Sequence, residues 1–251
     1  MKLPYILDET YRVAWGDLCY MKENLPEVII TGLIGPLLCL LAFGYGVGGS
    51  VEGGSESYLR YIIPGIIALS TLSCTFSTVA MKVLVQRLFY MSFDELLLCP
   101  VHISSVILGK SLSGVIRSLI SCTIILFVGH LISPDISVDP LLFPVILLSG
   151  LTFSMFGMLA GMLTSKTQTL SLFTSIVIVP MTFLCGTLFD PSALPSFASA
   201  VIYMLPLTHV SQLMRGIMLD TGIPLDSVAM IVLYAAVFFA ACYHLIRNHR
   251  C

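Results

Sequence analysis

The stretch from Ile103 to Ile132 reads ISSVILGKSLSGVIRSLISCTIILFVGHLI, and only Lys110 and Arg117 carry a charge within it. A helix needs about 20 mostly apolar residues to cross the hydrocarbon core of a bilayer, so this stretch predicts a transmembrane helix. The whole chain has the same character, because 57% of its residues are hydrophobic and only 10% are charged. Soluble domains carry about 25% charged residues, so the composition indicates a membrane protein.

Five other stretches predict further transmembrane helices, although prolines interrupt some of them. Proline is tolerated in such helices because neighbouring groups can satisfy the carbonyl that it leaves free. The predicted fold class is therefore all-α, a polytopic membrane protein with six transmembrane helices in residues 28–251. In addition to Ile103–Ile132, the predicted spans are Val28–Val47, Tyr58–Val83, Leu141–Leu163, Thr169–Phe189 and Val228–Ile246.

Residues 1–27 form a separate element, because apolar and charged side chains alternate there and no long apolar run is present. The segment lacks the apolar region of a cleavable signal peptide. Its rough helical stripe predicts an amphipathic helix lying on the cytoplasmic leaflet. A solvent-exposed amphipathic helix is the alternative.

The basic residues orient the six predicted spans. The opposite loops are mainly acidic and contain only Arg60 and Arg215 as basic residues. Basic residues concentrate on the cytoplasmic side of membrane proteins, so both termini are expected in the cytoplasm. The basic residues that fall on that side are Lys2, Arg12, Lys22, Lys82, Arg87, Lys110, Lys166, Arg247 and Arg250.

Several functional classes lack support in this sequence. The net charge of −2 does not indicate a nucleic-acid partner. No phosphate-binding loop, zinc-protease motif or nucleophile elbow is present, so a transport subunit is expected rather than an enzyme. The cysteines form no CxxC pair and lie mainly in apolar runs, so no metal site is expected. A channel or secondary transporter and a membrane enzyme using His209 and Asp190 remain alternatives.

The segment after the second span, from Gln86 to His102, predicts a short helix from about Phe93 to Cys99. Ser92 and Glu95 have the spacing of a capping box, and Pro100 ends the helix. Such a helix at the cytoplasmic mouth of the bundle suits docking on a partner protein, although a plain connector also fits these residues.

The region after the fifth span contains a second group of motifs. Residues 183–195 read FLCGTLFDPSALP, residues 205–210 read LPLTHV and residues 213–216 read LMRG. Pro195 and Pro206 interrupt the region too often for a simple span. It is therefore expected to form a re-entrant or interfacial extracellular helix between spans five and six.

Together these two groups of motifs resemble the type-two ABC transporter permeases, particularly the lipo-oligosaccharide (nodulation-factor) and drug exporters. The resemblance covers almost the whole chain. It implies a coupling helix that contacts an ATP-binding subunit, and a re-entrant extracellular motif. The implied coupling residues are Phe93, Asp94, Glu95, Leu96, Leu97, Leu98, Pro100 and Val101. The implied re-entrant residues are Gly186, Phe189, Pro191, Leu194, Pro195, Pro206, Leu207, His209 and Arg215.

The resemblance also implies the partners and the reaction. Such permeases act as dimers, here a homodimer, with two ATP-binding subunits that hold ATP and Mg, so this chain is expected to bind no cofactor itself. The expected location is the plasma membrane of a prokaryote, in contact with membrane lipid. The expected function is ATP-driven export of a lipid, a glycoconjugate or a drug-like amphiphile.

A few polar residues are candidates for the transport pathway. Arg117 lies in the third span, where an ionisable residue is a functional candidate by default. It can instead extend its charge to the cytoplasmic surface. Ser73 and Ser77 are candidate lining residues, although small hydroxyl side chains also serve helix packing. His209 is expected to fix a loop, and Arg215 to pair with Asp190 or Asp220 or to contact an anionic headgroup.

Overall fold

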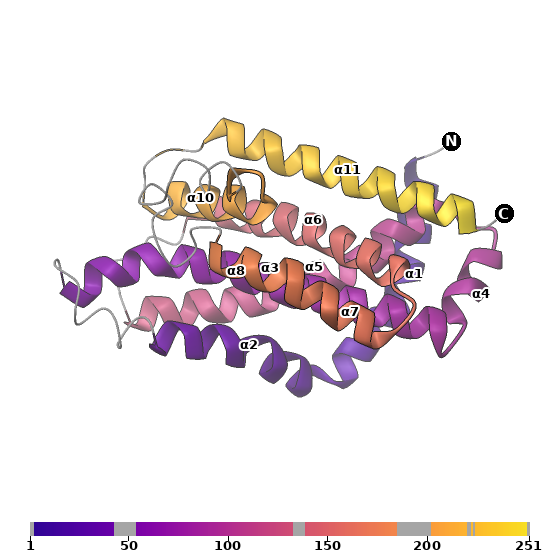
Figure 1. Ribbon diagram of the computed structural model, residues 1–251, viewed down its shortest axis with the longest axis horizontal. Helices are drawn as coiled ribbons and strands as arrows, with labels where there is room; N and C mark the ends of the chain where they lie inside the picture. The colour runs from indigo at the N-terminus through magenta and orange to yellow at the C-terminus, as the bar shows by residue number, and fades with distance from the viewer. Residues whose placement is uncertain are drawn as a thin grey trace.

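The computed structural model describes residues 3–42, 54–132, 139–184, 202–219, 222 and 224–249. Every regular element in these ranges is helical (Figure 1), so the predicted all-α class is confirmed there. The elements are α1 (Leu3–Glu23), α2 (Leu25–Leu41), α3 (Gly54–Leu88), α4 (Ser92–Leu98), α5 (Ile103–Ile132), α6 (Leu142–Leu163), α7 (Thr167–Phe173), the π-helix η3 (Thr174–Ile178), α8 (Val179–Leu184), α10 (Pro206–Met218) and α11 (Leu225–His249).

Four of these helices are long and apolar enough to cross a membrane. They correspond to the predicted second, third, fourth and sixth spans, at Ile62–Leu88, Ile103–Gly129, Leu142–Leu163 and Leu225–Asn248. Helices α1 and α2 meet at 85° and together can count as a fifth span. The predicted fifth span appears as the shorter apolar stretch Thr167–Phe183. The rest of the predicted first and fifth spans lies outside the described residues.

Helices α3, α5 and α6 form the centre of the bundle, and glycines let them approach closely. Gly157 and Gly161 lie one turn apart on α6 and face α3. A Cβ atom would lie 2.7 Å from the carbonyl oxygen of Phe76 at the first and 2.5 Å from that of Ala80 at the second. Small residues at this spacing are typical of helix contacts in membranes, where van der Waals packing drives association.

We expect Gly161→Ala to destabilise the protein by about 1–3 kcal/mol, the usual cost of overpacking, because its Cβ would collide with the α3 backbone. The matched control is Gly35→Ala in α2, where nothing lies within 4 Å of the added atom. Alanine favours helix over glycine by roughly 1 kcal/mol, so the control should be neutral or stabilising. Thermal unfolding of the purified variants in detergent measures both, and equal melting temperatures would contradict this packing.

Different helices form the two ends of the bundle. Helices α1 and α4 and the C-terminal end of α11 lie at one end, and α10 lies at the other (Figure 1). The 13 residues of α10 span only about 20 Å, less than the roughly 30 Å of a hydrocarbon core. Most of its side chains are nevertheless buried. The structure therefore supports an internal short helix before the last span.

Candidate functional site

Helix α1 turns two of its acidic residues, Glu9 and Asp17, toward the bundle. Glu9, Val13 and Asp17 recur at every fourth position, and the Glu9 and Asp17 residues are buried. Val13 lies so close to Gly109 of α5 that a Cβ there would be 2.7 Å from its Cγ1 atom. Tyr11 and Trp15 are instead about half exposed, at 53% and 54%. The predicted helix is present, but its aromatic stripe faces outward and the carboxylates of Glu9 and Asp17 face the protein.

Glu9 ties α1 to the start of α5. Its carboxylate accepts hydrogen bonds from the backbone N–H of His102 at 3.1 Å and from the Ser105 hydroxyl at 2.8 Å. The Nδ1 atom of His102 lies 3.1 Å from the same carboxylate. Burial raises the pKa of Glu9, but these hydrogen bonds and the histidine lower it, and the net pKa lies below the usual 4.5.

The lowered pKa of Glu9 predicts that the attachment of α1 to α5 through this residue, called the tether below, depends on pH. Because the folded pKa of Glu9 lies below its unfolded value, the tether is complete above about pH 4.5 and is lost as the pH falls through the folded value. Protection of the amides of residues 3–23, measured as the exchange rate relative to the intrinsic rate at each pH, should therefore fall in acid for the wild-type chain. Glu9→Gln should already be less protected at neutral pH and should change less on acidification. The exposed Glu23→Gln serves as control, and identical profiles for all three proteins would contradict the tether.

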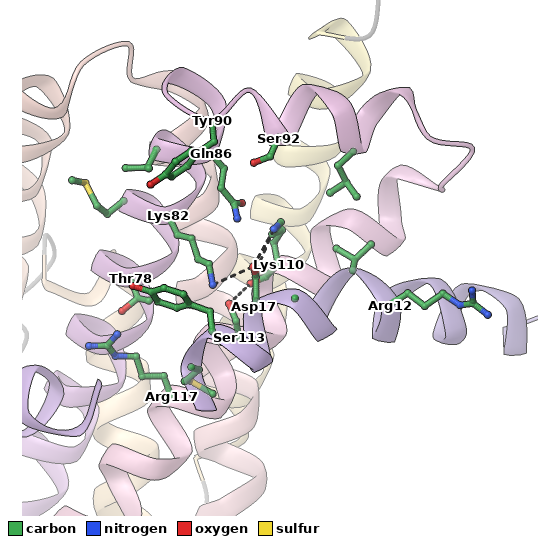
Figure 2. A pocket seen from close by; sticks show the side chains of 17 residues that line it. Arg12, Asp17, Thr78, Lys82, Gln86, Tyr90, Ser92, Lys110, Ser113 and Arg117 are labelled. Atoms are coloured by element: carbon green, nitrogen blue, oxygen red, sulfur yellow. Dashed lines mark hydrogen bonds and ion pairs between the residues drawn. The ribbon is translucent and has the colours of Figure 1, made fainter. Parts of the chain in front are cut away.

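Asp17 lies between two lysines from different helices. Its Oδ1 atom is 3.1 Å from Lys82 Nζ on α3, and its Oδ2 atom is 3.3 Å from Lys110 Nζ on α5. The side chains of Asp17 and Lys110 are only 6% and 9% exposed, and that of Lys82 is 23% exposed. Figure 2 shows the three side chains converging while Arg12 points away from them. The cluster joins α1, α3 and α5 at the end of the bundle that carries α4.

A cavity of about 780 Å³ opens beside this cluster. On α5, Lys110, Ser113 and Arg117 follow the i, i+3, i+7 spacing of one helix face, and all three line the cavity. Thr78 and Lys82 line it from α3, one turn apart. Two helix faces with polar residues at helical spacing therefore build a basic cavity wall, which α1 closes.

A second cavity of about 690 Å³ lies among α2, α3 and α8. Thr78 and Arg117 line both cavities, so the two adjoin at these side chains. The predicted pathway residues Ser73, Ser77 and Arg117 all line this second cavity. Its other walls are largely apolar and include Leu38, Ile66, Leu69 and Phe183.

The π-helix η3 lies next to the segment of α8 that lines the second cavity, and Pro180 explains why the helix changes there. Proline has no N–H to give to the carbonyl of Ile176, and its ring crowds that carbonyl. At such a point a π-helical turn lengthens the spacing of the backbone hydrogen bonds from four residues to five. Thr182 and Phe183 follow it and line the cavity.

The predicted coupling segment divides into buried and exposed residues. Phe93 and Leu97 are 1% and 8% exposed and pack among α3, α5, α6 and α11. Leu98 is 87% exposed, and Glu95 and Pro100 are exposed beside it. Leu98 and Glu95 are therefore on the surface, whereas Leu97 packs within the bundle.

The predicted capping box at Ser92 is wrong. Met91 precedes α4 with a φ of 55° in the left-handed region, and α4 has no side-chain cap hydrogen bond. The backbone N–H groups of Asp94 and Glu95 instead donate to the carbonyl of Met91 at 3.1 and 3.2 Å. Ser92 lies one position too late to cap the helix.

The described part of the re-entrant motif fixes the turn before α10. The Thr208 hydroxyl donates to the carbonyl of Ile202 at 2.6 Å, and His209 Nε2 donates to that of Tyr203 at 3.0 Å. This contact links His209 to the turn before α10, and its predicted loop-fixing role stays a prediction. Pro206 begins α10, and Leu207 and Arg215 lie within it. Gly186, Phe189, Pro191, Leu194 and Pro195 lie outside the described residues.

The sequence interpretation missed the cluster around Asp17. Lys82 and Lys110 are predicted from the sequence only as basic residues of the cytoplasmic side, and Glu9 and Asp17 are not singled out within residues 1–27. The available signal was the helical spacing of Lys110, Ser113 and Arg117 within an apolar span. Over the described part of the chain, no group of three or more His, Cys, Asp or Glu residues is arranged to hold a metal ion.

Comparison with known proteins decides the family. Residues 13–219 match the ABC-2 type transporter family, which is well over half of the chain. The chain belongs to the ABC-2 type transporter family. The predicted family resemblance is confirmed, and the protein is a multi-pass membrane permease of this family.

The relatives of this ABC-2 permease carry two different names. The inner membrane transport permease YadH of Escherichia coli K12 is 26% identical over 236 residues, which cover 89% of each chain. Nodulation protein J of Bradyrhizobium diazoefficiens is 29% identical over 238 residues and 88% of each chain. Nodulation protein J of Rhizobium meliloti is 30% identical over 232 residues and 86% of each chain.

Proposed function

We propose that this ABC-2 permease is the membrane subunit of an ATP-driven exporter that moves an amphiphile out of the cytoplasm or the inner leaflet. Two copies, together with two ATP-binding subunits that carry ATP and Mg, would form the working assembly in a prokaryotic inner membrane. Family membership is the observation that carries the proposal. The name of the relative YadH, an inner membrane transport permease, supports the location.

The exposed surface at the end of α4 supports the proposed contact with an ATP-binding subunit. Phe89, Tyr90, Met91 and Leu98 expose between 57% and 87% of their surface at the tip of the bundle. A group of large apolar residues on such a surface is typical of a protein contact. Arg87 anchors this tip, because its guanidinium donates to the carbonyls of Met162 and Thr164 at the end of α6. Force applied to α4 would thus reach α3 and α6.

The membrane topology completes the proposal. Six spans, with α2 as the first and α7 to α8 as the fifth, would place both termini, α1 and α4 in the cytoplasm. Residues 1–27 would lie on the cytoplasmic leaflet, with Tyr11 and Trp15 at the level of the headgroups. Residues 28–251 would form the transmembrane domain, with the region from Gly186 to Arg215 re-entrant on the outer side.

Reconstitution tests this function. The permease and its ATP-binding subunit are placed together in liposomes, and movement of a fluorescent amphiphile between leaflets is followed. We expect movement only with both subunits and hydrolysable ATP. Movement without ATP or partner would contradict the proposal and favour a secondary transporter. Chemical conversion of the amphiphile would favour a membrane enzyme.

A further inference from the structure

We propose that the cavity among α1, α3 and α5 binds the anionic headgroup of an amphiphile, whose apolar chain extends into the second cavity. This inference rests on the proposed export function and specifies its substrate class as amphiphiles whose headgroup carries a net negative charge.

The charges of the first cavity favour an anion. Arg12, Lys82, Lys110 and Arg117 line it, with Asp17 as the lining carboxylate among the described residues. Arg12 is engaged with Asp8 at 3.0 Å on the exposed face of α1. The remaining three basic residues face one acid, which leaves an excess of two positive charges. In a partly desolvated cavity such an excess attracts an anion more strongly than it would in water.

Asp17 shows how the cavity holds an anion. Its two carboxylate oxygens contact the two lysines at 3.1 and 3.3 Å, the geometry that an oxyanion of a ligand would adopt (Figure 2). Lys82 is the more exposed of the pair at 23%, so it is the lysine that can turn from Asp17 to a ligand. A ligand phosphate would therefore share or replace the contacts of Asp17.

The arrangement of the two cavities matches an amphiphile. Arg117 lies seven residues beyond Lys110 on α5, about 10 Å further along the helix, where the basic cavity meets the apolar one. A headgroup between Lys82 and Arg117 would leave its chain against Leu38, Ile66, Leu69 and Phe183. Lysines at the end of a span and apolar walls deeper in it repeat the polarity of the bilayer itself.

The test is binding to the full permease alone, in detergent, with three probes. They are oleoyl lysophosphatidic acid, oleoyl lysophosphatidylcholine and glycerol 3-phosphate. We expect lysophosphatidic acid to bind at least roughly tenfold more tightly than either of the other two and to raise the melting temperature of the wild-type chain. Equal affinity for both lysolipids would overturn the anion site. Equal affinity for glycerol 3-phosphate would assign the cavity to free phosphate esters and overturn the amphiphile.

Two variants locate the binding. Lys82→Gln should weaken lysophosphatidic acid binding roughly tenfold, the effect of losing about one charge contact. It leaves the Asp17–Lys110 pair in place, so the fold is retained. Asp17→Asn breaks the buried pair with Lys110 and should lower the melting temperature, but it removes the competing carboxylate and should tighten binding by the folded protein several-fold, whereas a purely structural role for the cluster predicts no gain. Lys22→Gln, on the exposed end of α1 and outside the cavity, should change nothing.

The outcome separates this inference from the proposed function, because the binding assay contains no ATP-binding subunit. Loss of anion selectivity with intact ATP-driven movement of a neutral amphiphile would overturn only the substrate class. Tight, Lys82-dependent binding without any ATP-driven movement would overturn the exporter and leave the anion site.

Discussion

Leu98→Asp should reduce ATP-driven transport by tenfold or more while the permease still inserts and folds. Leu98 exposes 87% of its surface at the end of α4, so a charge there costs the isolated permease little. On a partner, the same side chain would enter an apolar pocket, where an unpaired carboxylate carries a desolvation penalty of several kcal/mol. Pull-down of the ATP-binding subunit and transport in liposomes measure the two consequences.

The control for this prediction is Leu225→Asp. Leu225 is 78% exposed and begins α11 at the opposite end of the bundle. A carboxylate is favourable in the first turn of a helix, so this variant should retain transport. Leu97→Asp is a poor probe, because Leu97 is 8% exposed and its loss would unfold the end of the bundle. Full transport by Leu98→Asp would show that α4 is not the contact.

Hydropathy was sufficient to predict the four long spans, because each is a continuous apolar helix whose composition alone requires a bilayer. It was also sufficient to place α1 and α4, through a change in pattern and a terminating proline. The first and fifth spans were harder to predict. Helix α2 turns 85° from α1 after Asn24, and Pro180 interrupts the ladder between η3 and α8.

The inward direction of the α1 carboxylates could not be predicted from local sequence. Glu9 and Asp17 find their partners His102 and Lys110 93 residues along the chain, and the packing of Val13 on Gly109 lies between these two contacts on the same helix pair. The turn at Met91 shows the same limit on a smaller scale. A left-handed methionine has no sequence signature, so Ser92 was the natural but wrong choice of cap.

Reversal of the charge at Lys110 should have the largest effect on stability of any change in the cluster. Lys110→Glu would place a second carboxylate beside Asp17, where both side chains are less than 10% exposed. Breaking a buried ion pair commonly costs about 3–5 kcal/mol because one charge stays without a counter-charge. We expect a large loss of monodisperse protein in detergent and a lowered melting temperature.

The double variant Asp17→Lys with Lys110→Glu tests the cause of that loss. It restores the acid–base pair between positions 17 and 110 and keeps one acid and two basic side chains in the cluster, since Lys82 remains, and should recover a substantial part of the stability. Lys22→Glu, exposed on the same helix, should have little effect because surface charges contribute little. If the double variant were no more stable than Lys110→Glu alone, the charge pairing would not be what holds α1 on α5. Recovery would instead show that one buried carboxylate, reaching from the N-terminal helix to both α3 and α5, sets where that helix lies on the bundle.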